Sequence, residues 1–152
     1  MAKIIFDGWE VGMRKIPFKN LNMGEEIFIS ERYFVLFDYL VSHGQLLLRS
    51  DKRKGYDFNL DVIFYDTHFI QMFSMLNGIS IRLIDKPPVL YYENITTYLK
   101  YENNNIFEIE SAGEKFFIAA SYVRIFENNL EFNKTSLDFE EKDRGREIWR
   151  IK

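Results

Sequence analysis

The sequence predicts a mainly β or α+β fold, a single domain of antiparallel hairpins that form a meander, a barrel or two packed layers. Three dipeptides suited to tight two-residue turns support this prediction, namely Asp7-Gly8, Asn77-Gly78 and Ala112-Gly113. Aromatic residues make up 17% of the chain, while alanine, the strongest helix former, occurs only at Ala2, Ala112, Ala119 and Ala120. Together these features favour strands joined by short turns.

The size and composition indicate one soluble domain. The 152 residues fit a single domain spanning positions 1–152, and a hydrophobic content of 47% excludes disorder. The chain has no cysteine, which excludes disulfides, thiolate metal sites and cysteine nucleophiles. The first residues lack a signal-peptide pattern, and no stretch approaches the roughly 20 apolar residues of a membrane helix. We therefore expect a cytoplasmic protein with no membrane partner.

The N-terminal part is expected to form a hairpin across Asp7-Gly8, then an irregular connection and an extended segment at Ile27 to Ile29. The stretch from Ser30 to Ser42 fits two interpretations. As a helix it would carry an apolar stripe between a serine cap and a terminating glycine, and it would cover the sheet. As a strand it would suit its phenylalanine, tyrosine and valine content and would join a strand at Gln45 to Arg49. The residue content favours the strand.

The centre of the predicted fold is the stretch from Asn59 to Ile84. Every position from Val62 to Tyr65 is apolar, as in a central strand whose two faces are both covered. Downstream, Asn77-Gly78 accepts positive φ at both central positions of a turn. This dipeptide predicts a type I′ hairpin with Leu76 opposite Ile79.

A further hairpin is predicted at Ile106 to Ala120. Side-chain alternation favours a register with Ile109 opposite Phe116 and Glu110 opposite Lys115. Because alanine fits positive φ poorly, a type I turn followed by a bulge at the glycine is the alternative. The other expected elements are a charged loop at Ser50 to Asp57, a strand at Leu90 to Tyr101, a hairpin at Val123 to Phe132 across Asn128-Asn129, and a terminal strand at Glu147 to Ile151.

The candidate catalytic side chains are Asp61, Asp66 and His68, with Asp57 nearby. On a strand, Asp66 and His68 share a face, so a carboxylate and an imidazole could serve one metal ion or one proton-transfer path. Asp61 would then point to the opposite face. The alternative is that Asp66 and Thr67 form a turn between two strands, because aspartate is common in turns.

No other motif defines a chemistry. His43 follows Ser42, but no Gly-x-Ser-x-Gly elbow exposes a serine, so a structural histidine is the simpler interpretation. Arg49 and residues 52–54 form a basic cluster beside two aromatic residues, an arrangement that can grip single-stranded nucleic acid. Neighbouring aspartates dilute this cluster, so a solvated loop is the better interpretation. Without a glycine-rich phosphate loop, the sequence predicts no cofactor, and it predicts no metal site.

The charge is unevenly distributed along the chain. Residues 1–101 carry 12 acidic and 12 basic side chains, whereas residues 102–147 carry 11 acidic and 6 basic ones, a net charge of −5. This distribution argues against nucleic acid as a partner and favours a basic protein.

We therefore expect a non-catalytic binding protein that recognises another protein with a basic surface. Toxin-neutralising immunity proteins offer an analogy of charge and size alone. The candidate binding residues are Glu108, Glu110, Tyr91, Tyr92 and Tyr98. Two alternatives stay open: a metal-dependent hydrolase that uses Asp66 and His68, and a β module that binds a small ligand or carbohydrate through the tyrosines.

Overall fold

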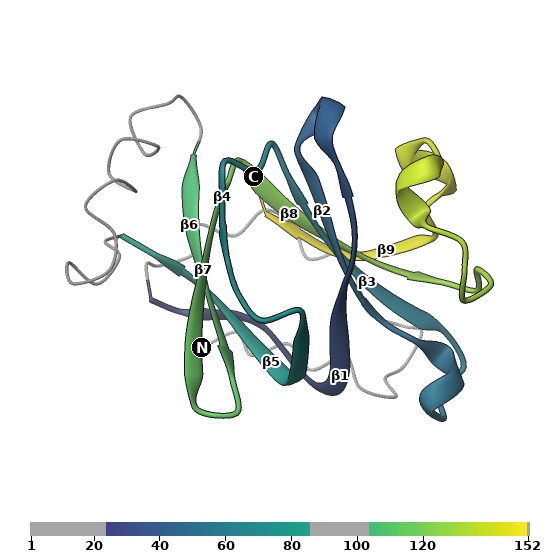
Figure 1. Cartoon of the computed structure of the whole chain (residues 1–152), viewed down its shortest axis with the longest axis horizontal. Helices are drawn as coiled ribbons and strands as arrows, with labels where there is room; N and C mark the ends of the chain where they lie inside the picture. The colour runs from purple at the N-terminus through teal and green to yellow at the C-terminus, as the bar shows by residue number, and fades with distance from the viewer. Residues whose placement is uncertain (1–23, 86–103, 152) are drawn as a thin grey trace.

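The computed structural model describes residues 24–85 and 104–151, and over these residues the protein is mainly β, as predicted. In this part of the chain nine strands form one antiparallel sheet in the order β4-β7-β6-β5-β1-β2-β3-β8-β9 (Figure 1), and the sheet does not close into a barrel. The strands are β1 (Glu26–Leu40), β2 (Gln45–Ser50), β3 (Asn59–Tyr65), β4 (Phe69–Gln71), β5 (Met75–Ile84), β6 (Asn105–Ser111), β7 (Glu114–Ala120), β8 (Tyr122–Asn128) and β9 (Arg146–Ile151).

Helical structure in the described ranges is limited to single turns of 3-10 helix. These are η1 (Val41–His43), η2 (Lys52–Lys54), η3 (Ser136–Asp138) and η4 (Glu141–Asp143). None of the described helices is long and apolar enough to span a membrane.

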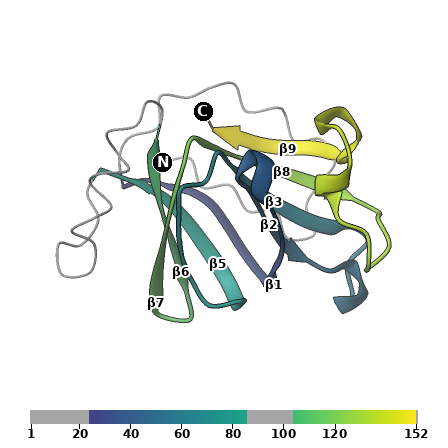
Figure 2. The ribbon, with the colours of Figure 1, turned by 45° about the horizontal axis from the view of Figure 1, so that its top comes forward.

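One face of the sheet encloses the main hydrophobic core. The sheet folds over on itself, so that β4 to β7 lie on one side and β2, β3, β8 and β9 on the other, as Figures 1 and 2 show. Phe64 of β3 meets Phe107 of β6 edge to face, with ring centroids 5.4 Å apart, although three strands separate β3 from β6 in the sheet. Both rings are fully buried, and burying each stabilises the fold by about 1.5–3 kcal/mol.

β3 is a central strand, as its continuous apolar run predicts. It pairs with β2 on one side and with β8 on the other, and all seven of its residues are buried. Its even-numbered side chains belong to the main core, whereas Ile63 and Tyr65 belong to a second cluster on the outer face of the sheet. A strand that is buried on both faces needs apolar residues at its odd-numbered and its even-numbered positions.

The helix considered for Ser30 to Ser42 is wrong, and the strand interpretation is confirmed. β1 runs from Glu26 to Leu40 and pairs with β5 on one side and β2 on the other. Pairing on both sides satisfies the backbone of a segment rich in aromatic and β-branched residues, which lose side-chain freedom in a helix. Only Val41–His43 turns helically, and Gly44, with φ of 58°, ends that turn.

The hairpin predicted at Asn77-Gly78 is wrong. The dipeptide lies inside β5, where Leu76 pairs with Phe34 and Ile79 pairs with Ser30, so Leu76 does not face Ile79. Gly78 adopts a φ of +73° and lies opposite two residues of β1, which is a β-bulge. The bulged residues are Glu31 and Arg32 of β1, and the positive φ that suits Gly78 to a tight turn is used here at the strand position opposite them. Pairing of β5 with both β1 and β6 decides between the two.

The hairpin at Ala112-Gly113 is confirmed in its predicted register. Ile109 pairs with Phe116 and Glu110 pairs with Lys115 across β6 and β7. Ala112 has a φ of 49° and Gly113 a φ of 82°, so both central residues are left-handed, as in a type I′ turn. The bulged alternative is therefore wrong, because side-chain burial on the core face outweighs the strain at one alanine.

The hairpin predicted across Asn128-Asn129 is also wrong. β8 ends at Asn128 and pairs with β3 and with β9, which confirms the predicted terminal strand. Residues 129–145, here called the cover segment, pack on the outer face of the sheet through Leu137. Leu137 completes the second cluster, which also contains Leu47, Ile63, Tyr65 and Phe126.

Several predicted features lie outside the described residues. These are the hairpin at Asp7-Gly8, the strand at Leu90 to Tyr101, and the candidate binding residues Tyr91, Tyr92 and Tyr98.

Candidate functional site

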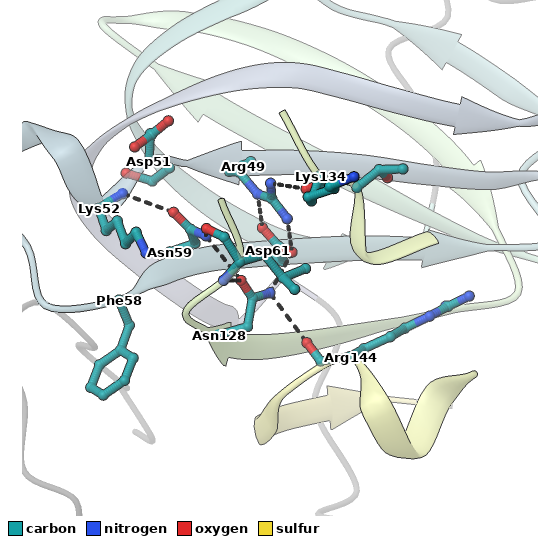
Figure 3. A network of polar contacts seen from close by, with 12 residues as sticks. Arg49, Asp51, Lys52, Phe58, Asn59, Asp61, Asn128, Lys134 and Arg144 are labelled. Carbon is teal, nitrogen blue, oxygen red and sulfur yellow. Dashed lines mark hydrogen bonds and ion pairs between the residues drawn. The ribbon is translucent and has the colours of Figure 1, made fainter. Parts of the chain in front are cut away.

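A network of buried polar side chains joins the sheet to the cover segment (Figure 3). Arg49 of β2 donates from Nε and Nη2 to the two carboxylate oxygens of Asp61 on β3, at 2.7 and 2.8 Å. Both side chains are completely buried. Asn128 of β8 donates a further hydrogen bond to Asp61 Oδ2 at 2.7 Å. The carboxylate of Asp61 is therefore neutralised and shielded from solvent.

The same network holds the cover segment by its backbone carbonyls. Arg49 Nη1 donates to the carbonyl of Lys134 at 2.5 Å, and Asn59 Nδ2 donates to the carbonyl of Leu130 at 2.9 Å. Asn128 Nδ2 lies 3.2 Å from the carbonyl of Arg144. Buried carbonyls without partners are costly, so these donors fix the path of a segment that lacks strand pairing.

A second anchor of the cover segment lies around Tyr65. The buried guanidinium of Arg144 donates to the Tyr65 hydroxyl at 2.9 Å, to Gln45 Oε1 at 2.8 Å and to the carbonyl of Phe139 at 3.0 Å. Tyr65 stacks on Tyr122, with ring centroids 4.5 Å apart. Burial raises the pKa of Tyr65 to about 12, and this effect outweighs the hydrogen bond and the positive charge of Arg144, which lower it. These contacts make this region a structural anchor.

The candidate catalytic residues are divided between two places. Asp61 belongs to the buried network, whereas Asp66 and His68 lie in the connection between β3 and β4. Asp66 has a φ of 54°, and its Oδ1 lies 3.2 Å from His68 Nε2. Ser121 Oγ donates to Asp66 Oδ2 at 2.6 Å. Asp66 thus stands between the serine and the histidine, and neither of these two contacts joins His68 to the Ser121 hydroxyl, as a general base would require.

The described residues contain no group of three or more histidine, cysteine, aspartate or glutamate side chains that could hold a metal ion. Asp57 is exposed at a bend before β3. Ser42 Oγ lies 2.8 Å from His43 Nδ1 at the surface, but Asp38 accepts from the backbone N–H of Tyr39. The contacts of Ser42, His43 and Asp38 therefore do not join the three side chains into a serine–histidine–aspartate relay.

The basic cluster is also divided. Arg49 is buried in the network, and Arg53 forms hydrogen bonds with Asp51 at 3.0–3.1 Å. The hydrogen bonds from Arg53 hold the pKa of Asp51 below its usual value. Lys52 Nζ donates to Asn129 Oδ1 at 2.6 Å, which ties the loop after β2 to the cover segment. Two of the four cations in the cluster, Arg49 and Arg53, are thus paired with carboxylates of the same chain.

An open groove of about 340 Å³ lies over β1, β5 and the turn between β6 and β7. Gly78, opposite the bulge in β1, is one of its lining residues. The described residues that line it are Glu26, Ile29, Ser30, Glu31, Asn77, Gly78, Ile79, Ser80, Arg82, Glu110, Ser111, Ala112 and Gly113. None of these is aromatic, and most are polar, unlike the apolar lining typical of small-molecule pockets.

The charges in and beside this groove are mostly acidic. Arg82 is the one cation among its described lining residues, and its Nη2 lies 3.8 Å from Glu26 Oε2. Across the ladder, Arg82 also faces Glu108, which lies 3.7 Å from Lys115 Nζ. Arg82 is thus set between two carboxylates, and Glu31 and Glu110 add further negative charge to the groove.

The two predicted acidic binding residues therefore differ in their surroundings. Glu110 lines the groove, whereas the side chain of Glu108 is only 12% exposed and is engaged by Lys115. Sequence reasoning missed Glu26 and Glu31, because only the pairing of β1 with β5 brings them beside Glu110.

The chain matches no protein-family model, no curated protein and no solved structure.

Proposed function

We propose that this protein is a non-catalytic binding protein that recognises a basic segment of another protein through the groove at Gly78. The observation that supports the proposal is the grouping of Glu26, Glu31 and Glu110 around one concave surface whose single described cation faces Glu26 and Glu108. Carboxylates form strong charge-assisted hydrogen bonds with lysine and arginine side chains.

The physical role of these charges is to steer a basic partner toward the groove. Complementary charge accelerates association more than it strengthens the final complex, and salt screens it over about 10 Å at 0.1 M. The hydrolase alternative has less support, because Asp61 is buried against Arg49 and the serine, aspartate and histidine contacts form no relay. The small-ligand alternative has less support at this groove, because its described lining contains no aromatic ring on which a ligand could stack.

The test is charge reversal at the groove. A fluorescein-labelled peptide of about eight lysines serves as the probe, and its binding is measured by fluorescence anisotropy at low and at high salt. The double variant Glu31→Lys, Glu110→Lys should weaken binding roughly tenfold or more at 0.05 M salt and far less near 0.5 M.

The matched control is Glu140→Lys, Glu131→Lys, which reverses the same number of charges on exposed residues of the cover segment. This control should retain most of the binding. If both double variants lose binding equally, attraction depends on total charge, and the groove is not the binding site.

A further inference from the structure

A partly exposed block of three apolar residues and one asparagine lies on the outer face of the sheet, next to the groove. Tyr33 of β1 pairs with Asn77 of β5, and Val35 pairs with Met75, so these four side chains share one face. Their neighbours Phe34 and Leu76 point the other way and are buried in the core. Tyr33 is 37% exposed and Met75 is 59% exposed. We call Tyr33, Val35, Met75 and Asn77 the β1–β5 block.

The block is continuous with the groove. Asn77 belongs to both, because it faces Tyr33 across the ladder and also lines the groove. Gly78 lies three positions after Met75 in β5, which corresponds to roughly 10 Å at the rise of a strand. A single extended segment of a partner could therefore place side chains on both surfaces.

The chemistry of the block suits a protein partner. Tyrosine and methionine are enriched where proteins meet, because they offer large contact areas and adapt to the opposite surface. The acidic side chains Glu31 and Glu110 at one end of the block favour a cationic occupant over a second copy of this acidic chain.

We infer that the basic partner of the groove also seats an apolar side chain on the β1–β5 block, two or four residues away from its cation along an extended segment, because side chains at even spacing share one face of such a segment. This inference rests on the proposed function. The carboxylates of the groove set the rate of association, and the contact with Tyr33 and Met75 sets the lifetime of the complex.

Two peptides of equal charge test the inference. Both carry three lysines in about nine residues. One places leucine and tyrosine two and four residues from a lysine, on the same face of an extended chain, and the other has serine at both positions. The apolar peptide should bind the wild type about tenfold more tightly. Met75→Ser should remove that advantage without changing the affinity for the serine peptide or the salt dependence of either.

The matched control is Val41→Ser. Val41 is an apolar residue that is 80% exposed in η1, outside the block, so its replacement should leave the preference intact. Thermal unfolding of both variants should match the wild type, because exposed apolar side chains contribute little to the core.

The outcomes separate this inference from the proposed function. If neither peptide binds at 0.05 M salt, the proposed function is wrong. If both bind equally well, or if Met75→Ser retains the preference, the inference is wrong while the proposed function stands. The oligomeric state of the wild type and of Met75→Ser is measured by analytical ultracentrifugation. If the wild type is a dimer and Met75→Ser is a monomer, the block binds a second copy of this chain and the inference is wrong.

Discussion

Arg49 and Asp61 form a two-pronged ion pair, at 2.7 and 2.8 Å, in the fully buried interior beneath the cover segment. The pair joins neighbouring strands, since Arg49 and Asp61 are directly opposite each other in the ladder of β2 and β3. Arg49 also reaches the backbone of Lys134, 85 residues away in the sequence. One side chain thus couples the centre of the sheet to the connection between β8 and β9.

Removing one partner of this pair should be strongly destabilising. We expect Asp61→Asn to lower the free energy of unfolding by about 3–5 kcal/mol, because it leaves the Arg49 guanidinium buried without a counter-charge. The measurement is urea unfolding followed by circular dichroism. The double variant Arg49→Met, Asp61→Leu should recover part of the loss, since it removes both charges. A loss below about 1 kcal/mol for Asp61→Asn would contradict the burial of the pair.

Alkaline pH should destabilise the protein through Tyr65. Its pKa is raised to about 12 by burial, whereas in the unfolded chain the Tyr65 phenol ionises near its ordinary pKa of 10.0. The unfolded state therefore loses the proton first, so stability that is present below pH 10 is lost as the pH rises toward 12. At about 1.4 kcal/mol per pKa unit, this loss approaches 2–3 kcal/mol.

The variant Tyr65→Phe isolates this effect. At pH 7 it should be less stable by about 1 kcal/mol, because Arg144 loses a hydrogen-bond acceptor. Between pH 10 and pH 12 it should lose less stability than the wild type, so the difference between the two narrows or reverses. If the free energy of unfolding falls equally with pH in both proteins between pH 10 and pH 12, the Tyr65 phenol is not protected from ionisation.

The turn between β6 and β7 should become more stable with a second glycine. Ala112 is exposed and has a φ of 49°, a left-handed conformation that costs a residue with a Cβ about 1–2 kcal/mol. Ala112→Gly should raise the free energy of unfolding by about 1 kcal/mol. Gly113→Ala is the converse control and should lower the free energy of unfolding. The space beside Gly113 is open, so only its φ of +82° opposes a side chain. Destabilisation by Ala112→Gly would argue against the type I′ turn.

Divalent metal ions should not stabilise the wild type through Asp66 and His68. No described cluster offers three ligating side chains, and one oxygen of Asp66 already accepts from Ser121. Differential scanning fluorimetry with zinc and with manganese is the measurement, and His68→Ala is the control. A rise in melting temperature that His68→Ala abolishes would restore the metal-dependent alternative.

The sequence identified individual strands better than their partners. The run from Val62 to Tyr65 predicted a central strand, because its apolar side chains point to both faces of the sheet and both faces must therefore be covered. The register of Ile109 with Phe116 followed from alternation across a short turn. By contrast, Asn77-Gly78 has the same local signal as a turn but lies within a strand. A preference for positive φ does not distinguish a turn from a strand position opposite a bulge.

The candidate site was predicted only in part. Glu110 was identified from charge and alternation, and it lines the groove. Glu31 could not be linked to it, since 79 positions separate the two residues and β5 lies between their strands. In the same way, Asp61 was a candidate catalytic residue because the order of residues in the chain does not reveal that Arg49 pairs with it.

What the sequence determined by itself is local: strand content, the alternation that assigns each side chain to a face, and the hairpin at Ala112-Gly113. These depend on backbone preferences and on neighbours a few residues away. The tertiary structure alone decided that β5 continues through Gly78 between β1 and β6, and that Arg49 meets Asp61 beneath the cover segment. Such choices depend on hydrogen bonds and burial between residues distant in the chain, whose summed free energy exceeds the preference of any one turn dipeptide.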